Sequence, residues 1–399
     1  MSQIRLDDGF TKTGTELTEL NETLRDMDDM TFCAPVRLDE IEVLSVTGRM
    51  IGEDGIERVT VLRNIPGSKQ PIVGTITLES MRKGGATEAL FDEMFGRTKL
   101  LLRINQQIYF TSTELLNTLP QRIKLGGAQI QVPTPKRDEY INELFGLYPI
   151  RATLMYRRIG RIKKAFSLFT RSYSKIDQTL LTDIISNIGG DLGRPKCESW
   201  TVEHPLSSVV ISFPDKARDI AAVYKLPNQI TPCLYLGTSD TGNSSITAIG
   251  KLMIDGKSCV YSDVYRRKHR GDVNPGTLLA EIENKIFAKY TRLPERLCEL
   301  MTVPVSNPRT VAKQVLDQIR FTGETGKELG AELTRALLDE FTPGLSYTAY
   351  DVAVAIMTLP SRCSGVAKST IEKLEEVCGR APFVQYQTKA TAVPVLLPA

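Results

Sequence analysis

The stretch CLYLGTSDTGNSSITAIGKLMIDGKSCVYSDVY, residues 233–265, decides the fold class. Three runs within it, 233–237, 245–254 and 259–265, are rich in β-branched and aromatic residues, which favours strands. Asp255-Gly256 separates the last two runs and is typical of a tight turn. Because so short a turn joins antiparallel strands, the sequence predicts a mixed or antiparallel sheet core.

Helices are expected on both sides of these strands. Apolar residues recur at helical spacing in 175–188, and Pro275 opens an amphipathic pattern that continues to Tyr290. Four further apolar stripes, separated by proline or glycine, predict helices at 310–321, 327–341, 347–358 and 368–378. Together with the alternating runs between residues 36 and 148, they predict an α+β fold of sheets with packed helices.

Changes in composition divide the chain into four expected regions. They are an acidic helical arm at 1–35, a small α/β domain at 36–148, a basic α+β core domain at 149–300, and a helical C-terminal region with an extended tail at 301–399. In the arm, Leu17, Leu20, Leu24 and Met27 share one helical face, which predicts an amphipathic helix of about four turns. It packs either on its own domain or on a neighbouring subunit.

Composition narrows the class of protein. A chain of 399 residues with 41% hydrophobic and 24% charged residues is ordinary for a globular protein, so we expect buried cores rather than extended disorder. It has no apolar run of about 18 residues and no basic, apolar start, so we expect an intracellular protein without a membrane span. Its seven cysteines show no C-x-x-C spacing, which favours buried reduced thiols over disulfides or zinc.

The distribution of charge is the least random feature of the sequence. No acidic residue occurs between Leu144 and Ile176, although the net charge of the whole chain is only +3. This window holds eight cations with aromatic residues among them, and a second basic cluster follows the predicted strand that ends at Tyr265. Cations neutralise phosphates and aromatic rings stack on unpaired bases, so the pattern suits a polyanion. Alternatively, the aromatic residues belong to a core and the cations to a solvated face.

On the first interpretation, the candidate residues for nucleic-acid binding come from both clusters. The first cluster supplies Tyr156, Arg157, Arg158, Arg161, Lys163, Lys164, Phe166, Phe169, Arg171, Tyr173 and Lys175, and the second supplies Arg266, Arg267, Lys268, His269 and Arg270. Phe166, Phe169 and Tyr173 are the candidates for stacking on bases.

Catalytic chemistry has little support in this sequence. Only His204 and His269 could act as general bases near neutral pH, and no nucleotide-binding, serine-hydrolase or zinc-protease motif occurs. Carboxylate-metal chemistry needs no histidine, so an enzyme that uses Asp240 and Asp263 stays open as an alternative. We assign no catalytic residue, no metal ligand and no cofactor.

Several short segments carry a family resemblance. They are Arg171–Asp177 before a predicted helix, the turn Thr238–Ser245, Cys259 with Arg267–Gly271, and Tyr347–Tyr350 at the start of a helix. In this order, over residues 150–380, they resemble domain of unknown function family 932, which is found in phages, prophages and plasmids. This chain departs from the family at Val260-Tyr261, where an asparagine-glycine pair usually follows the cysteine. The resemblance implies a mobile-element protein of the bacterial cytoplasm and no particular reaction.

Three hypotheses follow. The leading one is a phage- or plasmid-encoded accessory protein that binds single-stranded DNA in recombination or annealing, as a homo-oligomer. The first alternative is a structural or assembly protein of a phage particle, in which the acidic arm of one chain docks on the basic segment of the next. The second alternative is a nuclease-like enzyme that depends on a divalent metal.

Overall fold

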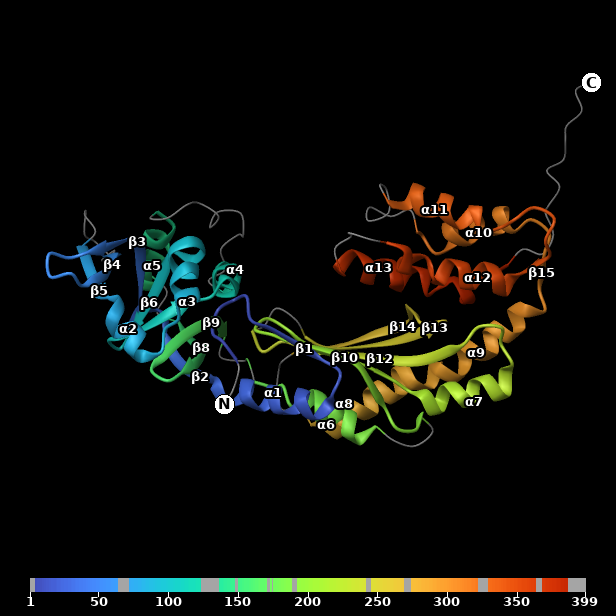
Figure 1. Cartoon of the computed structure of the whole chain (residues 1–399), viewed down its shortest axis with the longest axis horizontal. Helices are drawn as coiled ribbons and strands as arrows, with labels where there is room; N and C mark the ends of the chain where they lie inside the picture. The colour runs from blue at the N-terminus through green and yellow to red at the C-terminus, as the bar shows by residue number, and fades with distance from the viewer. Residues whose placement is uncertain are drawn as a thin grey trace, which may run out of the picture.

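The structure, a computed structural model, describes residues 4–63, 72–122, 136–147, 150–170, 173, 175–188, 192–241, 245–268, 274–321, 329–363 and 368–386. Two sheets organise the chain. The first sheet lies with its helices at one end of an elongated molecule, and the second sheet extends along the rest of it (Figure 1). The α+β fold predicted from the sequence is confirmed.

The first sheet has eight strands. In spatial order they are β2 (Thr31–Arg37), β8 (Arg151–Ile159), β9 (Ile162–Thr170), β7 (Gln107–Thr111), β6 (Leu100–Ile104), β3 (Ile41–Ile51), β4 (Glu57–Arg63) and β5 (Ile72–Thr77). All neighbours are antiparallel except β7 and β9, which run parallel and pair only at Phe110–Lys164 and Thr111–Ala165. The sheet is therefore mixed, as predicted.

The second sheet has six antiparallel strands. In spatial order they are β1 (Thr11–Gly14), β10 (Lys196–Glu203), β11 (Ser207–Ser212), β12 (Ile230–Thr238), β13 (Ile246–Ile254) and β14 (Lys257–Arg267). The predicted tight turn joins β13 to β14, where Asp255 (φ 49°) and Gly256 (φ 77°) both have positive φ. Positive φ at both central residues is the geometry that two-residue hairpins require, which explains the Asp-Gly sequence. A two-stranded ladder of β15 (Pro304–Val305) and β16 (Tyr347–Thr348) completes the strands of the described chain.

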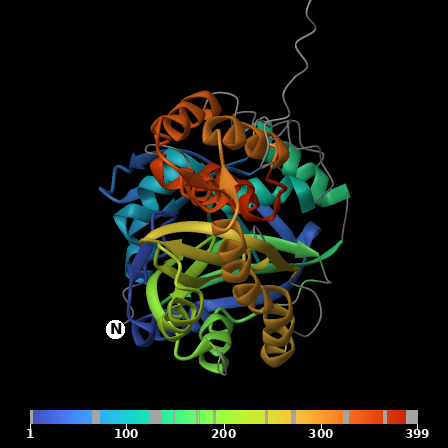
Figure 2. The same cartoon turned by 90° about the vertical axis from the view of Figure 1, so that its right-hand side faces the viewer.

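Helices cover both sheets. They are α1 (Leu17–Met30), α2 (Leu78–Gly84), α3 (Glu88–Glu93), α4 (Thr113–Arg122), α5 (Lys136–Leu147), α6 (Leu180–Asn187), α7 (Pro214–Tyr224), α8 (Pro275–Ile282), α9 (Ala288–Met301), α10 (Pro308–Gln318), α11 (Leu329–Asp339), α12 (Ala349–Met357) and α13 (Lys368–Cys378). Helices α6 to α9 lie along one face of the second sheet. Helices α12 and α13 face the other side, with α10 and α11 outside them (Figure 1, Figure 2).

The sheets divide the chain differently from the expected regions. The boundary expected at residues 148 and 149 falls inside the first sheet, because β8 and β9 lie between β2 and β7. The N-terminal arm is not separate either, since β1 pairs with β10 in the second sheet. Pairing between segments far apart in sequence produces both differences, and local periodicity carries no signal for it.

Buried apolar residues hold the sheets and helices together. One continuous core extends from α1 and the first sheet through the second sheet to α12, and a smaller core lies between the first sheet and α4 and α5. The predicted helix of the N-terminal arm is α1, which buries Leu20, Leu24 and Met27 within its own chain. All seven cysteines are free thiols. Cys233, Cys259 and Cys378 are buried as expected, whereas Cys33 is exposed on β2.

Candidate functional site

The hairpin of β8 and β9 carries most of the first basic cluster. Arg157 pairs with Lys164 across the two strands, and the next pair is Arg158 with Lys163. Because side chains alternate between the faces of a sheet, these two pairs point to opposite sides. Farther along the hairpin, Phe166 has no partner in the register, which marks a β-bulge.

Arg157 lies in the interior and joins the two sheets. Its side chain is 0% exposed, and its Nη2 donates to both carboxylate oxygens of Asp240 at 2.7 Å. Its Nη1 donates to Nδ1 of His204 at 2.7 Å and its Nε donates to the Thr31 hydroxyl at 3.1 Å. Asp240 and His204 follow strands of the second sheet, so this guanidinium is a structural link between the sheets.

Neighbouring groups complete this buried network. Gln178 donates from Nε2 to Asp240 Oδ2 at 2.9 Å, and the Tyr173 hydroxyl donates to the Asp240 carbonyl at 2.6 Å. His204 donates from Nε2 to the Arg5 carbonyl at 2.8 Å, which leaves Nδ1 as an acceptor for Arg157. Burial, and then the charge of Arg157, lower the pKa of His204 well below its usual value. His204 is therefore a neutral structural histidine, not a general base.

Lys164 is also buried, in a second set of ion pairs. Its Nζ donates to Asp8 Oδ1 at 2.6 Å and to the two Glu93 oxygens at 2.6 and 2.8 Å. Glu93 ends α3, and Asp8 belongs to the acidic N-terminal segment, so this lysine ties that segment to the first sheet. The attraction between acidic arm and basic segment expected for the assembly hypothesis therefore operates within one chain.

These positions correct part of the predicted site. Arg157 and Lys164 are completely buried and paired with carboxylates, so neither is available to a phosphate. Phe166 and Phe169 are core residues, and Tyr173 stacks on Phe169 at 3.5 Å between ring centroids. Lys175 pairs with Asp177 at 3.0 Å. The alternative of a core with a solvated face is therefore right for the two phenylalanines, which are buried, and wrong for Arg157 and Lys164, which are buried in ion pairs and not solvated.

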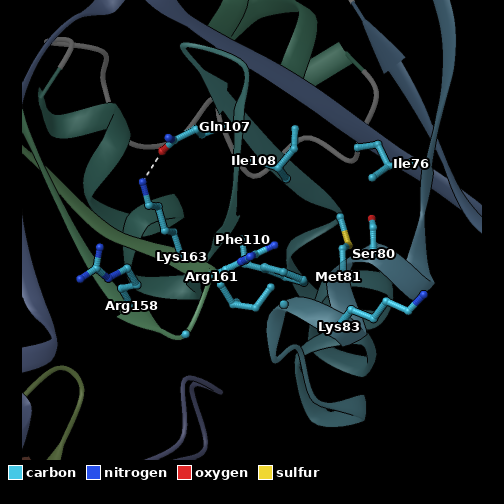
Figure 3. A pocket seen from close by; sticks show the side chains of 13 residues that line it. Ile76, Ser80, Met81, Lys83, Gln107, Ile108, Phe110, Arg158, Arg161 and Lys163 are labelled. Carbon is cyan, nitrogen blue, oxygen red and sulfur yellow. Dashed lines mark hydrogen bonds between the residues drawn. The ribbon is translucent and has the colours of Figure 1, made fainter.

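Three other cations of the hairpin border a pocket. It has a volume of about 530 Å³ and lies between the turn of the hairpin, the start of β7 and α2 (Figure 3). Arg158, Arg161 and Lys163 line it from the hairpin, and Lys83 lines it from the end of α2. We call these four residues and the space between them the basic pocket. Its lining contains no carboxylate.

The backbone explains why a pocket forms here. Strands β7 and β9 pair at only two positions, so the backbones of their first residues are not paired with each other. The pocket opens between these first residues, where Gln107, Ile108 and Lys163 line it. On the other side, Arg161 N donates to the Gly84 carbonyl at 3.0 Å and fixes the hairpin turn against α2. Gly160 in that turn has φ 57° and lies so close to the Gly84 carbonyl that a side chain would crowd it.

Exposed cations and aromatic rings alternate beside the pocket. Arg158 lies over Phe32 at 4.6 Å from the ring centroid, and Phe32 stacks on Tyr156. Lys163 lies 5.4 Å from the centroid of Tyr156 and donates to the Gln107 side chain. Partial burial, and then the charge of Arg158, lower the pKa of Lys163. Within the described chain, no carboxylate pairs with Arg158, Arg161 or Lys163, so an anion would be stabilised here.

The second basic cluster is only partly within the described residues. Arg266 and Lys268 are exposed at the end of β14, whereas Arg267 pairs with Glu281 at 3.5 Å. His269 and Arg270, like Arg171 of the first cluster, lie outside the described residues.

Sequence analysis missed several residues of the site. Lys83, Gln107 and Ile108 line the pocket but come from parts of the chain with no basic or aromatic cluster. Phe32 enters through the pairing of β2 with β8. A local pattern could not find these residues, because strand order brings them together.

Asp240 has no free oxygen for a metal. Arg157 takes both oxygens and Gln178 shares one of them. The described part of the chain has no group of three or more histidine, cysteine or acidic residues placed to hold a metal ion. Asp240 therefore cannot serve as the metal ligand that the metal-dependent alternative requires. The side chain of Asp263 is not among those described.

Comparisons with protein-family models, with curated proteins and with solved structures found no match for this chain. Among the described residues, no helix combines the length and the apolar character that crossing a membrane requires. Inferences about function therefore rest on the geometry of the basic pocket.

Proposed function

We propose that this protein binds single-stranded nucleic acid at the basic pocket. The observation that supports this proposal is that Arg158, Arg161 and Lys163 line one concavity and that none of them pairs with a carboxylate in the described chain. Lys83, which pairs with Glu79 at 2.6 Å, also borders it. Burial, and then the charge of Arg158, lower the pKa of Lys163, so an anion bound beside these two cations would be stabilised. Backbone phosphates would supply the missing negative charge and release counterions on binding.

The shape and lining of the pocket favour a single strand over a duplex. A flexible single strand can enter a concave site between a hairpin and a helix, whereas duplex phosphates are held on a stiff cylinder. Ile76 and Ile108 supply an apolar part of the lining that a base could contact. Half-buried Tyr156 and Phe32 lie next to Arg158 and extend the contact surface along β8 and β2.

The family resemblance adds a biological setting to the proposal. A mobile-element protein with this activity would act in recombination or annealing of phage or plasmid DNA. In this setting the protein would accelerate the annealing of complementary oligonucleotides as well as bind them.

The test is fluorescence anisotropy of a labelled single-stranded oligonucleotide titrated with the full chain at several salt concentrations. We expect Arg158→Gln/Lys163→Gln to bind more weakly. Its log–log salt slope should be smaller by about 1.4, because each phosphate contact on a single strand contributes about 0.7. Duplex DNA and single-stranded RNA of the same sequence serve as competitors.

The matched control is Lys225→Gln/Lys313→Gln, which removes the same charge from two exposed residues outside both basic clusters. If both double variants lower the slope equally, net charge and not the basic pocket governs binding. An absence of binding by the unmodified protein at low salt would overturn the proposal. Equal affinity for the duplex would overturn the preference for a single strand.

A further inference from the structure

The two large sheets have four edge strands, and one of them differs from the rest. Three carry features that discourage pairing with another chain. Strand β1 has only four residues, β2 contains Pro35 and ends in Arg37, and β14 carries Lys257, Arg266 and Arg267, with α13 packed against it. Short length, proline, charge and a covering helix are the devices that protect sheet edges.

Within the described residues, β5 has none of these devices. There it is the last strand of the first sheet, its one partner is β4, and its sequence IVGTIT has no charge and no proline. Its apolar side chains are exposed, with Val73 at 65% and Ile72 at 46%. A strand of this kind presents a row of backbone donors and acceptors together with apolar surface to any matching edge.

We propose that β5 pairs with β5 of a second copy of this chain, so that two first sheets join into one continuous sheet. A two-fold axis perpendicular to the sheet makes two copies of one edge strand antiparallel, and the contact closes as a dimer. Such an edge needs no other protein as a partner, because the backbone donors and acceptors of one copy match those of a second, antiparallel copy.

The sequence of β5 suits a two-fold axis at Gly74. Ile72 then faces Ile76 of the partner subunit on one side of the sheet, and this pair occurs twice. Val73 faces Thr75 of the partner subunit on the other side. Every facing pair is uncharged, and β-branched pairs of this kind stabilise neighbouring strands. A Cβ at Gly74 would make ordinary contacts with Val61, at 3.5 Å, and Arg63, at 4.0 Å, so a small side chain can be introduced at the axis without disturbing the fold.

The dimer would place two basic pockets on either side of one seam, because Ile76 of β5 also lines the pocket. Two such pockets would form a longer cationic path than one chain offers. The existence of the dimer does not depend on nucleic-acid binding, so the two proposals can fail separately.

The test is the mass of the full chain in solution, by sedimentation velocity and by light scattering after gel filtration. We expect a dimer of twice 44.3 kDa for the unmodified protein and a monomer for Val73→Lys. Lysine replaces an exposed side chain, so the fold should persist, while two like charges meet near the axis. Val73→Thr is the matched control and should stay dimeric, because it keeps a β-branched, uncharged residue.

Cross-linking locates the seam. In a Cys33→Ser background, which removes the exposed natural thiol, Gly74→Cys should form a disulfide-linked dimer on mild oxidation. A monomeric unmodified protein would overturn the proposal. A dimer that withstands Val73→Lys, or that cross-links at none of Val73, Gly74 and Thr75, would show that another surface holds the copies together. Oligonucleotide affinity of the Val73→Lys monomer, measured separately, reports on the pocket alone.

Discussion

Two consecutive cross-strand pairs of one hairpin have opposite surroundings. Arg157 and Lys164 point into the interior, where carboxylates of Asp8, Glu93 and Asp240 neutralise them. Arg158 and Lys163, one residue away on each strand, point to the outside beside a pocket that no carboxylate lines. The four residues are indistinguishable in composition and nearly adjacent in sequence.

The difference shows that the alternation of side chains along a strand, and not the local density of charge, decides which cations of a basic cluster are buried and which are exposed. An isolated charge in the protein interior costs several kcal/mol, so a buried cation must be paired with an acidic residue. The two inward cations are therefore found next to buried carboxylates. The outward pair needs no partner in water and is free for a ligand. Arg157 and Lys164 therefore stabilise the fold, whereas Arg158 and Lys163 remain available for binding.

Removing the inward arginine should have the largest effect. Arg157→Met leaves Asp240 buried without its cation, and breaking a buried pair in this way costs about 3–5 kcal/mol. We expect this loss in the free energy of unfolding from urea denaturation. Arg158→Met, the same substitution one residue later, is the matched control and should change it by less than about 1 kcal/mol, because what it loses is the cation–π contact with Phe32.

A second variant separates the ion pair from general damage to the core. Arg157→Met/Asp240→Leu removes both charges and should recover part of the loss, since buried pairs are often replaced by apolar residues at little cost. Equal stability of Arg157→Met and Arg158→Met would contradict the contrast between the two faces.

The inward lysine should make stability depend on pH, an intermediate effect. Burial, and then the hydrogen bond with Asp8, raise the pKa of Glu93 to about 7. In the unfolded chain Glu93 loses its proton at about pH 4.3, so between these values the folded state binds more protons. The contribution of Glu93 to the free energy of unfolding should therefore fall as the pH rises through this window, by at most about 1.4 kcal/mol per pH unit, while the lowered pKa of His204 acts in the opposite direction up to about pH 7.

Glu93→Gln tests this origin, because the amide oxygen still accepts from Lys164 but cannot titrate. Burial also raises the pKa of Asp28, to about 6, so the range between pH 6 and 7 reports most directly on Glu93. Measured by urea denaturation at each pH, the stability of the variant should rise between pH 6 and 7, because unfolded His204 binds a proton there that the buried His204 of the folded state does not. A pH dependence equal to that of the unmodified protein would assign the effect to a group other than Glu93.

Much of the fold could be predicted from the sequence because local signals agreed with it. The runs around Asp255-Gly256 became β12, β13 and β14, and the arm pattern became α1. The strand order could not be predicted in the same way. The pairing of β1 with β10, and of β2 with β8, joins segments separated by more than 100 residues. The apolar pattern of a strand predicts which face is buried, but not which other strand it pairs with.

The candidate site was predicted only as a stretch of chain. The lack of acids around β8 and β9 located the hairpin, yet the sequence offered no means to separate Arg157 from Arg158. Two features hid the difference. The acids that neutralise the inward pair come from Asp8, Glu93 and Asp240, far away in the chain, and the bulge at Phe166 shifts the alternation that would reveal the buried face.

The outward pair should show the smallest effect on stability. Arg158→Gln/Lys163→Gln removes two cations that have no carboxylate partner within the described chain, so it breaks no ion pair. Their contacts with Phe32, Tyr109 and Tyr156 are solvent-accessible cation–π contacts, each worth about 0.5–1 kcal/mol. Relief of the repulsion between Arg158 and Lys163, which lowers the pKa of the lysine, offsets part of that loss. We therefore expect the free energy of unfolding to fall by about 1–2 kcal/mol, less than the loss expected for Arg157→Met. A loss as large as that of Arg157→Met would mean that the outward pair also holds the fold together, and the contrast between the two faces would fail.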